Sequence, residues 1–521
     1  MMKGCYNYYL QLRQEVSLWL DQSLLMDGLG PHGGGEDEAN YALTWFQHYL
    51  VTGDGKVMDH FRNLLAELAR WIEGRCFHGY PPKADVHHGP EPFLLFLPRY
   101  LALDPHDERA KAILEDAAHH IGNWVEGIPE WYDYDSDRFR SYYLGTREVE
   151  GDPRYVYEVA EHIRFIHIAL AAYRVTGVKR YLDWAIRYGR RRAQLILEVR
   201  DNPIPVMWDA DGRGVYEYEL KSPRQKRMAC SQHHTPRDPL AGVENLLASG
   251  AIYAFGDLFL ITGDKVFKEA SRKVIEPLIG ELLDPYADPA AAAVWYYRWT
   301  FQDTSFDDDI LDVLSGIPPE STNDLAMVFP QTLRRREPGV GKRKDMIYWG
   351  EWSDDGSVRP TREPSTAALT LAYHMTGDVR YARRAFKSAA IKLMMARRVL
   401  RGGREHADMG GAICSVAAGH GRNWGHGAVT GCYSPLLLGT REILSGLIPA
   451  IEVKDERNEI RLPKEILSLV KPPVEDEGEV LFFNGSESSV SFSWRRRDGE
   501  WIPLTMAPEE VRRFPIRVRR W

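Results

Sequence analysis

A recurring pattern of two helices joined by a short turn constrains the fold of this chain most strongly. Residues 39–72, 164–196, 250–283 and 365–397 each contain an apolar helical stretch, a turn such as "TGD" or "TGV", and a second helical stretch. Residues 92–125 contain a degenerate copy whose turn is "DPHDER". Apolar residues spaced by three and four define amphipathic helices. The turn glycine permits a left-handed helix stop and the aspartate caps the next helix. The sequence therefore predicts a series of helical hairpins.

The two helices of each hairpin differ in polarity. The first is nearly apolar on all sides, whereas the second carries charges on one side, so we expect an inner ring of buried helices and an outer ring of half-exposed ones. Together with helical stretches at 6–25 and 433–447, the five hairpins approach the twelve helices of an (α/α)6 toroid. The turns are unequally spaced, near residues 53, 105, 177, 263 and 377. Unequal spacing favours a closed ring with long loops over a regular solenoid.

The C-terminal part of the chain has a different pattern. Residues 478–506 alternate apolar and polar positions and contain the turn sequences "NGS" and "RDG", which is typical of β-hairpins. We therefore predict a mainly α toroid over residues 1–473 and a small β-rich appendage over residues 474–521.

Charge and hydropathy exclude several classes of partner. The net charge is −8, with both signs interspersed, so there is no basic field to hold nucleic acid. No apolar run approaches the roughly 20 residues that span a bilayer, and the N-terminus lacks the apolar core of a signal peptide. Five scattered cysteines without a CxxC pair fit a reducing compartment. We expect a cytoplasmic protein without a membrane partner, or a secreted one if a leader has been removed. The sequence leaves open whether the protein forms a homo-oligomer.

Two loops between the hairpins combine arginine with proton-transferring side chains. The sequence "FRSYYLGTRE" (139–148) contains Arg140 and Arg147 around a tyrosine pair, and "GRNWGHG" (421–427) adds arginine, asparagine, tryptophan and histidine. Arginine binds carboxylates through its planar fork, and phenols or imidazoles transfer protons. This inventory suits β-elimination of a uronic-acid glycoside, which neutralises the sugar carboxylate, removes the C5 proton and protonates the leaving oxygen. The predicted catalytic residues are Tyr143, His426, Tyr142 and His88, and the predicted substrate-binding residues are Arg140, Arg147, Arg422, Asn423, Trp424, His234, Glu351 and Arg404.

Hydrolysis by a pair of carboxylates is the alternative chemistry. Its candidates are Asp85, Glu91, Asp324 and Glu351, and their spacing singles out no pair. Three further polar residues at helical spacing, in "EHIRFIH" (161–167), indicate a cavity lining: Glu161, Arg164 and His167.

No cofactor motif is present in the sequence. HExxH, zinc, EF-hand, P-loop and GxGxxG patterns are all absent. The sequence requires no cofactor, and a divalent metal held by residues from distant segments stays open.

Over residues 6–450 the chain resembles the (α/α)6-toroid carbohydrate-active enzymes. The resemblance rests on hairpin sequences such as "AYRVTGVKRY" and "AYHMTGDVRY", on the aromatic-rich inserts and on the β appendage. It is shared with heparinase-like polysaccharide lyases and with six-hairpin uronate-processing glycosidases. It implies a carbohydrate substrate, with a lyase of uronic-acid glycans as the first hypothesis. A glucuronidase or unsaturated-uronide hydrolase is the second, and a sugar epimerase or a non-enzymatic helical-repeat protein follows.

Overall fold

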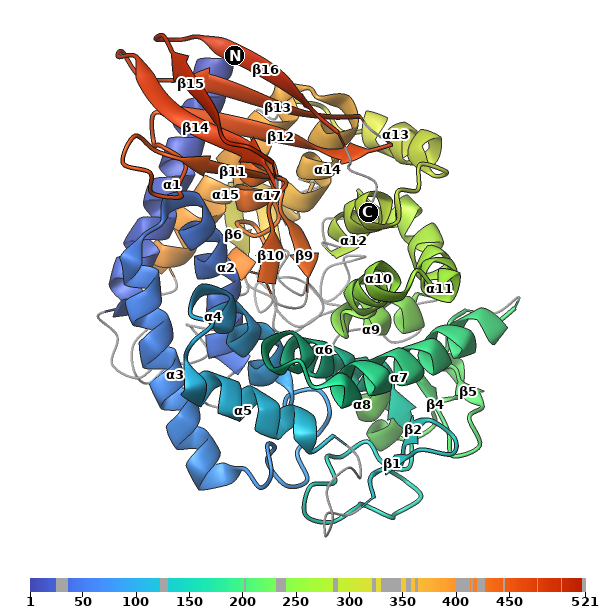
Figure 1. The fold of residues 1–521 in the computed structure, drawn as a ribbon. Helices are drawn as coiled ribbons and strands as arrows, with labels where there is room; N and C mark the ends of the chain where they lie inside the picture. The colour runs from blue at the N-terminus through green and yellow to red at the C-terminus, as the bar shows by residue number, and fades with distance from the viewer. Residues whose placement is uncertain are drawn as a thin grey trace.

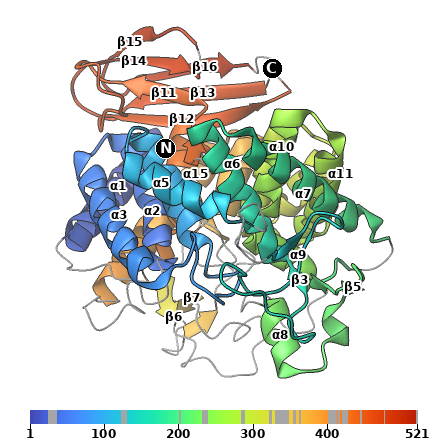
Figure 2. The same cartoon turned by 60° about the horizontal axis from the view of Figure 1, so that its bottom comes forward.

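The protein is mainly helical, with a layer of β-strands at one end (Figures 1 and 2). The structure is a computed structural model, and the statements below concern the residues that it describes: 1–24, 36–121, 130–200, 203–230, 240–283, 289–320, 325–328, 348–352, 358–360, 364–399, 413, 416–418, 427–443, 446–475, 477–497 and 499–517.

The predicted hairpins are confirmed. After α1 (Met2–Leu24), the pairs are α2 (Glu36–Thr52) with α3 (Gly55–Arg75), α4 (Leu97–Leu103) with α5 (Glu108–His119), α6 (Arg164–Thr176) with α7 (Lys179–Glu198), α10 (Ala251–Thr262) with α11 (Lys265–Ile275), and α14 (Thr366–Thr376) with α15 (Val379–Val399). A further pair, α12 (Pro289–Phe301) and α13 (Asp307–Ser315), was not predicted. Its turn, "QDTSF", lacks the Thr-Gly pair that marks four of the five predicted hairpins.

The Thr-Gly-Asp turns work as their chemistry predicts. Gly177, Gly263 and Gly377 end α6, α10 and α14 with φ of 74°, 69° and 70°, values that glycine adopts without strain. Asp54 and Asp264 then cap the following helices, because their carboxylates accept the backbone N–H of the second residue after them, at 3.0 and 3.1 Å.

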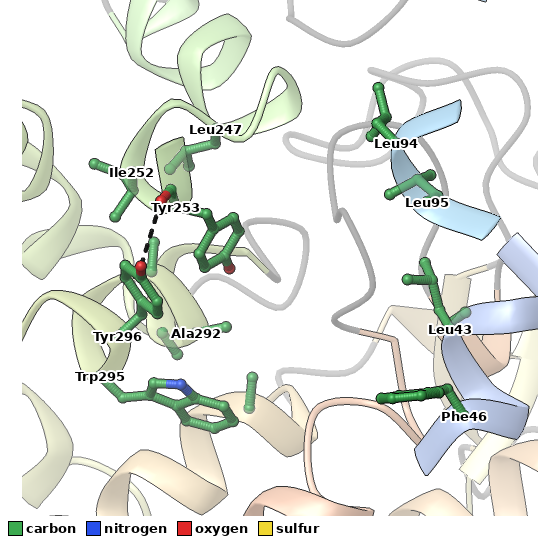
Figure 3. Close-up of a cluster of buried hydrophobic side chains, with 14 of the residues drawn as sticks. Leu43, Phe46, Leu94, Leu95, Leu247, Ile252, Tyr253, Ala292, Trp295 and Tyr296 are labelled. Atoms are coloured by element: carbon green, nitrogen blue, oxygen red, sulfur yellow. Dashed lines mark hydrogen bonds between the residues drawn. The ribbon is translucent and has the colours of Figure 1, made fainter. Parts of the chain in front are cut away.

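Burial separates inner from outer helices as expected. Every residue from Ala251 to Leu258 in α10 is buried, whereas α11 buries only one side. Figure 3 shows Leu43 and Phe46 of α2 lying across the interior from Tyr253 of α10 and Trp295 of α12. The hydrophobic core therefore runs along the inner helices.

The contacts between helices return to the start of the chain. Helix α2 contacts the π-helix η1 (Pro92–Phe96), which contacts α6; α6 contacts α10, α10 contacts α12, and α12 contacts α14. Thr370 of α14 donates to the carbonyl of Gly431 at 2.9 Å, just before α17 (Tyr433–Leu438). Gln47 of α2 in turn donates to the Thr430 carbonyl at 3.0 Å. Such a closed series of contacts is what a ring requires, and the regular six-hairpin toroid stays a prediction.

The β-rich part begins earlier than predicted. The hairpin of β9 (Arg441–Ile443) and β10 (Gly446–Ile448) follows α17, so the predicted helical stretch 433–447 is wrong beyond Leu438. Strand β12 (Ile466–Val474) also precedes the predicted boundary at residue 474. It is buried along almost its whole length because it packs between its sheet and helices α12, α14 and α17. Its sequence therefore lacks the alternation by which a half-exposed strand is recognised.

Two antiparallel three-stranded sheets form this part of the protein. One joins β11 (Ile451–Lys454), β14 (Val490–Arg496) and β15 (Ile502–Met506); the other joins β12, β13 (Glu477–Asn484) and β16 (Val511–Ile516). Phe482 of β13 packs against Trp494 of β14, with ring centroids 5.6 Å apart, so the two sheets share a core. Shorter sheets lie in the loops: β1 (Tyr132–Asp133) with β2 (Arg138–Phe139), β3 (Glu158–Val159) with β4 (Met207–Trp208) and β5 (Gly214–Val215), and β6 (Leu325–Val328) with β7 (Tyr348–Trp352) and β8 (Val358–Pro360).

Within the described ranges, no single helix has both the length and the hydropathy of a membrane span; only α9 (Ala241–Ala248) and α10 reach them together, as a pair bent by 62°.

Buried histidines make stability depend on pH. Burial lowers the pKa of His48 and His374 to about 3, from an ordinary value of 6.5. Below pH 6.5 the unfolded chain therefore binds protons that the folded protein does not, and stability falls as the pH falls from 6.5 towards 3. Each such histidine is expected to cost about 1 kcal/mol at one pH unit below 6.5. Urea unfolding midpoints at neutral and mildly acidic pH test this, and His374→Gln should reduce the difference. A midpoint that is equal at both pH values would contradict it.

Candidate functional site

Two loops that are distant in sequence lie side by side at the candidate site. Residues 84–86 run antiparallel to residues 142–144: the N–H of Val86 donates to the Tyr142 carbonyl at 3.3 Å, and that of Leu144 to the Ala84 carbonyl at 2.9 Å. This pairing brings the loop that carries His88 next to Tyr142 and Tyr143, three of the four residues predicted to be catalytic. The loops precede inner helices, where a rigid scaffold holds them.

Asp85 and His88 form a hydrogen-bonded pair at this site. The Nδ1 atom of His88 lies 3.1 and 3.3 Å from the two carboxylate oxygens of Asp85. The N–H groups of His87 and His88 donate to Asp85 Oδ1 at 3.1 and 2.9 Å. Burial raises the pKa of Asp85, but the hydrogen bonds and charge of His88, with the backbone N–H groups, outweigh it, so the pKa lies below its ordinary value. The carboxylate is ionised and fixes the orientation of an imidazole that is 42% exposed.

Four buried polar residues adjoin the Asp85–His88 pair through His87, whose ring centroid lies 4.5 Å from that of His88. We call them the buried layer: His87, Glu91, Glu161 and Arg164. The ring nitrogens of His87 lie 3.9 Å from a carboxylate oxygen of Glu91 and 3.9 Å from one of Glu161. Arg164 Nη1 lies 2.8 Å from Glu91 Oε1. All four are at most 3% exposed. Buried charges persist only when they are paired, so this layer is a tightly constrained part of the structure.

Arg164 connects three segments of the chain. It stands at the start of α6, after the 3-10 helix η2 (Ala160–Ile163). Its guanidinium donates to the His87 carbonyl, to Glu91, and, at 3.1 Å, to the carbonyl of Ala248 at the end of α9. The loop that carries the Asp85–His88 pair is thus tied to two helices.

Two further histidines contact backbone carbonyls near the site. His167 is fully buried, and its Nε2 lies 3.3 Å from the Ser249 carbonyl; its role in lining a cavity stays a prediction. His162 Nε2 lies 3.0 Å from the carbonyl of Ser141, in the loop that leads to Tyr142. Burial lowers the pKa of His167 to about 3 and that of His162 to about 4. Both rings are therefore neutral near pH 7, and His162 positions the tyrosine loop.

The other described residues of the predicted site are less well placed. Tyr142 is 7% exposed and packs on Tyr143, with ring centroids 5.2 Å apart; Tyr143 is half-buried. Arg140 and Arg147 are exposed: Arg140 lies 3.6 Å from Glu130, and the Arg147 guanidinium lies 4.9 Å from the centroid of the Phe77 ring. Each arginine thus has a partner outside the Asp85–His88 pair.

Several predicted site residues lie outside the described residues: His426, Arg422, Asn423, Trp424, His234, Arg404 and Asp324. Glu351 is described only in its backbone, which pairs with Leu325 and Arg359 in the β6–β7–β8 sheet. The roles of all these residues stay predictions. Of the glycine-rich loop, residues 427–431 are described, and the N–H of Gly427 donates to Thr430 Oγ1 at 2.8 Å.

The described part of the chain contains no group of three or more histidine, cysteine, aspartate or glutamate side chains arranged to hold a metal ion. A divalent metal held by residues outside the described ranges stays the open alternative stated from the sequence.

Comparisons with known proteins give little help with function. No protein-family model and no curated protein matches the chain. Among solved structures, "Crystal structure of unsaturated glucuronyl hydrolase specific for heparin" matches with 13% sequence identity and a TM-score of 0.36, over 76% of this chain and 97% of that one. A similarity of this size establishes no shared activity.

Proposed function

We propose that the protein is a glycoside hydrolase that acts on carbohydrates containing uronic acid, with the Asp85–His88 pair in its active site. One observation carries the proposal: an ionised carboxylate orients a partly exposed imidazole above the buried layer. The uronic-acid class rests on the resemblance of the sequence to toroidal carbohydrate-active enzymes.

The geometry of the pair suits a general base. Since Nδ1 of His88 faces Asp85, we assign to its Nε2 the role of accepting a proton from water, and Asp85 then stabilises the imidazolium. In hydrolysis, that water attacks the anomeric carbon while an acid protonates the leaving oxygen. We assign the acid to one of the remaining sequence candidates, Asp324 or Glu351.

β-Elimination is the second candidate, and Tyr143 is the residue that favours it. Its backbone pairs with that of Asp85, so a phenol and an imidazole lie in adjacent loops, as a base and an acid for elimination would. The reaction also needs a cation to neutralise the sugar carboxylate. Arg140 and Arg147, the two described arginines predicted for that task, lie against Glu130 and Phe77. We therefore place hydrolysis first.

Product analysis separates these reactions. The protein is incubated with oligosaccharides of glucuronic, galacturonic and iduronic acid, with and without an unsaturated terminal residue. Hydrolysis releases reducing ends without new ultraviolet absorbance, and it removes absorbance where the unsaturated residue is released. Elimination creates absorbance with each new reducing end. A change of sugar configuration without cleavage would indicate an epimerase, and no change with any substrate would overturn the proposal.

A further inference from the structure

A cavity lies at the other end of the molecule from the Asp85–His88 pair, between α1 and the β-rich part. Its volume is about 730 Å³, and it is lined by Arg13 of α1, by the loop 455–465 and by the turn 486–491. Pockets that bind small molecules usually enclose about 300–1,000 Å³. Figure 2 shows β3 and α9, which flank the buried layer, at the end of the helical body opposite to β12–β16. The cavity is therefore separate from the Asp85–His88 pair.

Hydrogen bonds from three directions fix the walls of this cavity. The N–H of Leu462 donates to the Val51 carbonyl at 2.8 Å, at the end of α2. Arg13 donates to the Leu462 carbonyl at 3.1 Å and to the Tyr9 hydroxyl at 2.7 Å. The fully buried side chain of Asn484 donates to the carbonyls of Ser488 and Met506 at 2.8 and 3.0 Å. The loop and the turn are thus anchored to the helical body and to the sheet.

Apart from Arg13, the charged residues of the lining fall into two groups. Asp455 is bonded to Arg461, and Glu456 accepts the N–H of Ser491 at 3.3 Å. In contrast, no ion pair or side-chain hydrogen bond between described residues engages the side chains of Arg457, Lys464 and Glu465. Two cations and one carboxylate, together with the hydroxyl of Ser489, are therefore available to a ligand.

We propose that this cavity binds a hydroxylated anion, and specifically an acidic saccharide. Lys464 and Arg457 supply the cations for its carboxylate, sulfate or phosphate group. Glu465 accepts hydrogen bonds from sugar hydroxyls, and Ser489 can donate or accept them. The choice of a saccharide among hydroxylated anions rests on the proposed function. The proposal that the cavity binds an anion is independent of that function.

Equilibrium binding tests the proposal independently of turnover. Glucuronate, glucose 6-phosphate and glucose are titrated calorimetrically into the full chain carrying Asp85→Asn, which leaves the cavity intact. We expect one or both anions to bind more tightly than glucose. Adding Lys464→Gln should weaken that binding about tenfold, as loss of a charged hydrogen bond does, and adding Ser489→Trp should block it. Lys179→Gln, an exposed lysine at the start of α7, is the matched control and should change nothing.

The outcomes separate the two proposals. Tighter binding of either anion than of glucose supports the acidic saccharide, and binding of glucose 6-phosphate alone identifies a phosphate rather than a carboxylate as its acidic group. Equal binding of glucose and the anions, no binding, or binding unchanged by both Lys464→Gln and Ser489→Trp would overturn the cavity proposal. Absence of hydrolysis together with Lys464-dependent binding would overturn the proposed function and leave the cavity proposal standing.

Discussion

Replacing Asp85 with asparagine is expected to lower kcat/KM by about 100- to 10,000-fold, because the general base His88 loses the carboxylate that orients and stabilises it. Asparagine keeps an oxygen for the N–H groups of His87 and His88, but it carries no charge to stabilise a protonated His88. Initial rates of reducing-end release measure the effect. The thermal unfolding midpoint should stay within a few degrees of the wild-type value.

Asp54→Asn is the matched control, because Asp54 also accepts a backbone N–H, at the start of α3, where asparagine caps almost as well. That variant should retain full activity. If Asp85→Asn also retained it, the Asp85–His88 pair would have no part in the reaction.

Replacing Arg164 with methionine is expected to destabilise the protein by about 3–5 kcal/mol, the usual cost of breaking a buried ion pair. The change removes the arginine that pairs with buried Glu91 and releases the carbonyls of His87 and Ala248. Urea unfolding, followed by tryptophan fluorescence, gives the change in midpoint. Activity should fall as well, since the loop of the Asp85–His88 pair loses its anchor.

Arg62→Met provides the comparison for Arg164. Arg62 pairs with Asp59 on the surface, where both side chains are more than half exposed, and such pairs contribute at most about 1 kcal/mol. Adding Glu91→Leu to Arg164→Met should recover part of the lost stability by removing the buried carboxylate that has lost its arginine. A loss in Arg164→Met no larger than in Arg62→Met would show that the buried layer is not a structural anchor.

Local chemistry made most of the helical fold predictable. The Thr-Gly-Asp turn specifies both a helix stop and the next helix start, and the structure shows the left-handed glycines and capping aspartates that it implies. The α12–α13 hairpin was not predicted because its turn uses other residues. Strand β12 was not predicted because helices distant in sequence bury both of its faces together with its own sheet. A strand buried on both faces shows no alternation of apolar and polar residues.

The candidate site was predictable only in pieces. Spacing along one helical segment indicated Glu161 and Arg164, whereas the approach of His87 to Glu91, four residues apart, was not predicted. The pairing of the Asp85 loop with the Tyr143 loop joins segments nearly 60 residues apart, and a single sequence carries no record of such a contact. The same limit explains Arg140 and Arg147, whose residue type suited substrate binding but whose partners could not be foreseen.

The packing of α1 has a consequence for the order of folding. Helix α1 lies against α15, where Glu15 binds Arg397 at 2.6 Å, and Lys3 donates to the carbonyl of Gly485. These partners are synthesised about 380 and 480 residues after α1. During translation Tyr6 and Tyr9 of this helix therefore lack their packing partners Phe483 and Phe386 until most of the chain has left the ribosome. Contacts of such sequence separation slow folding and expose apolar surface to aggregation and to chaperones.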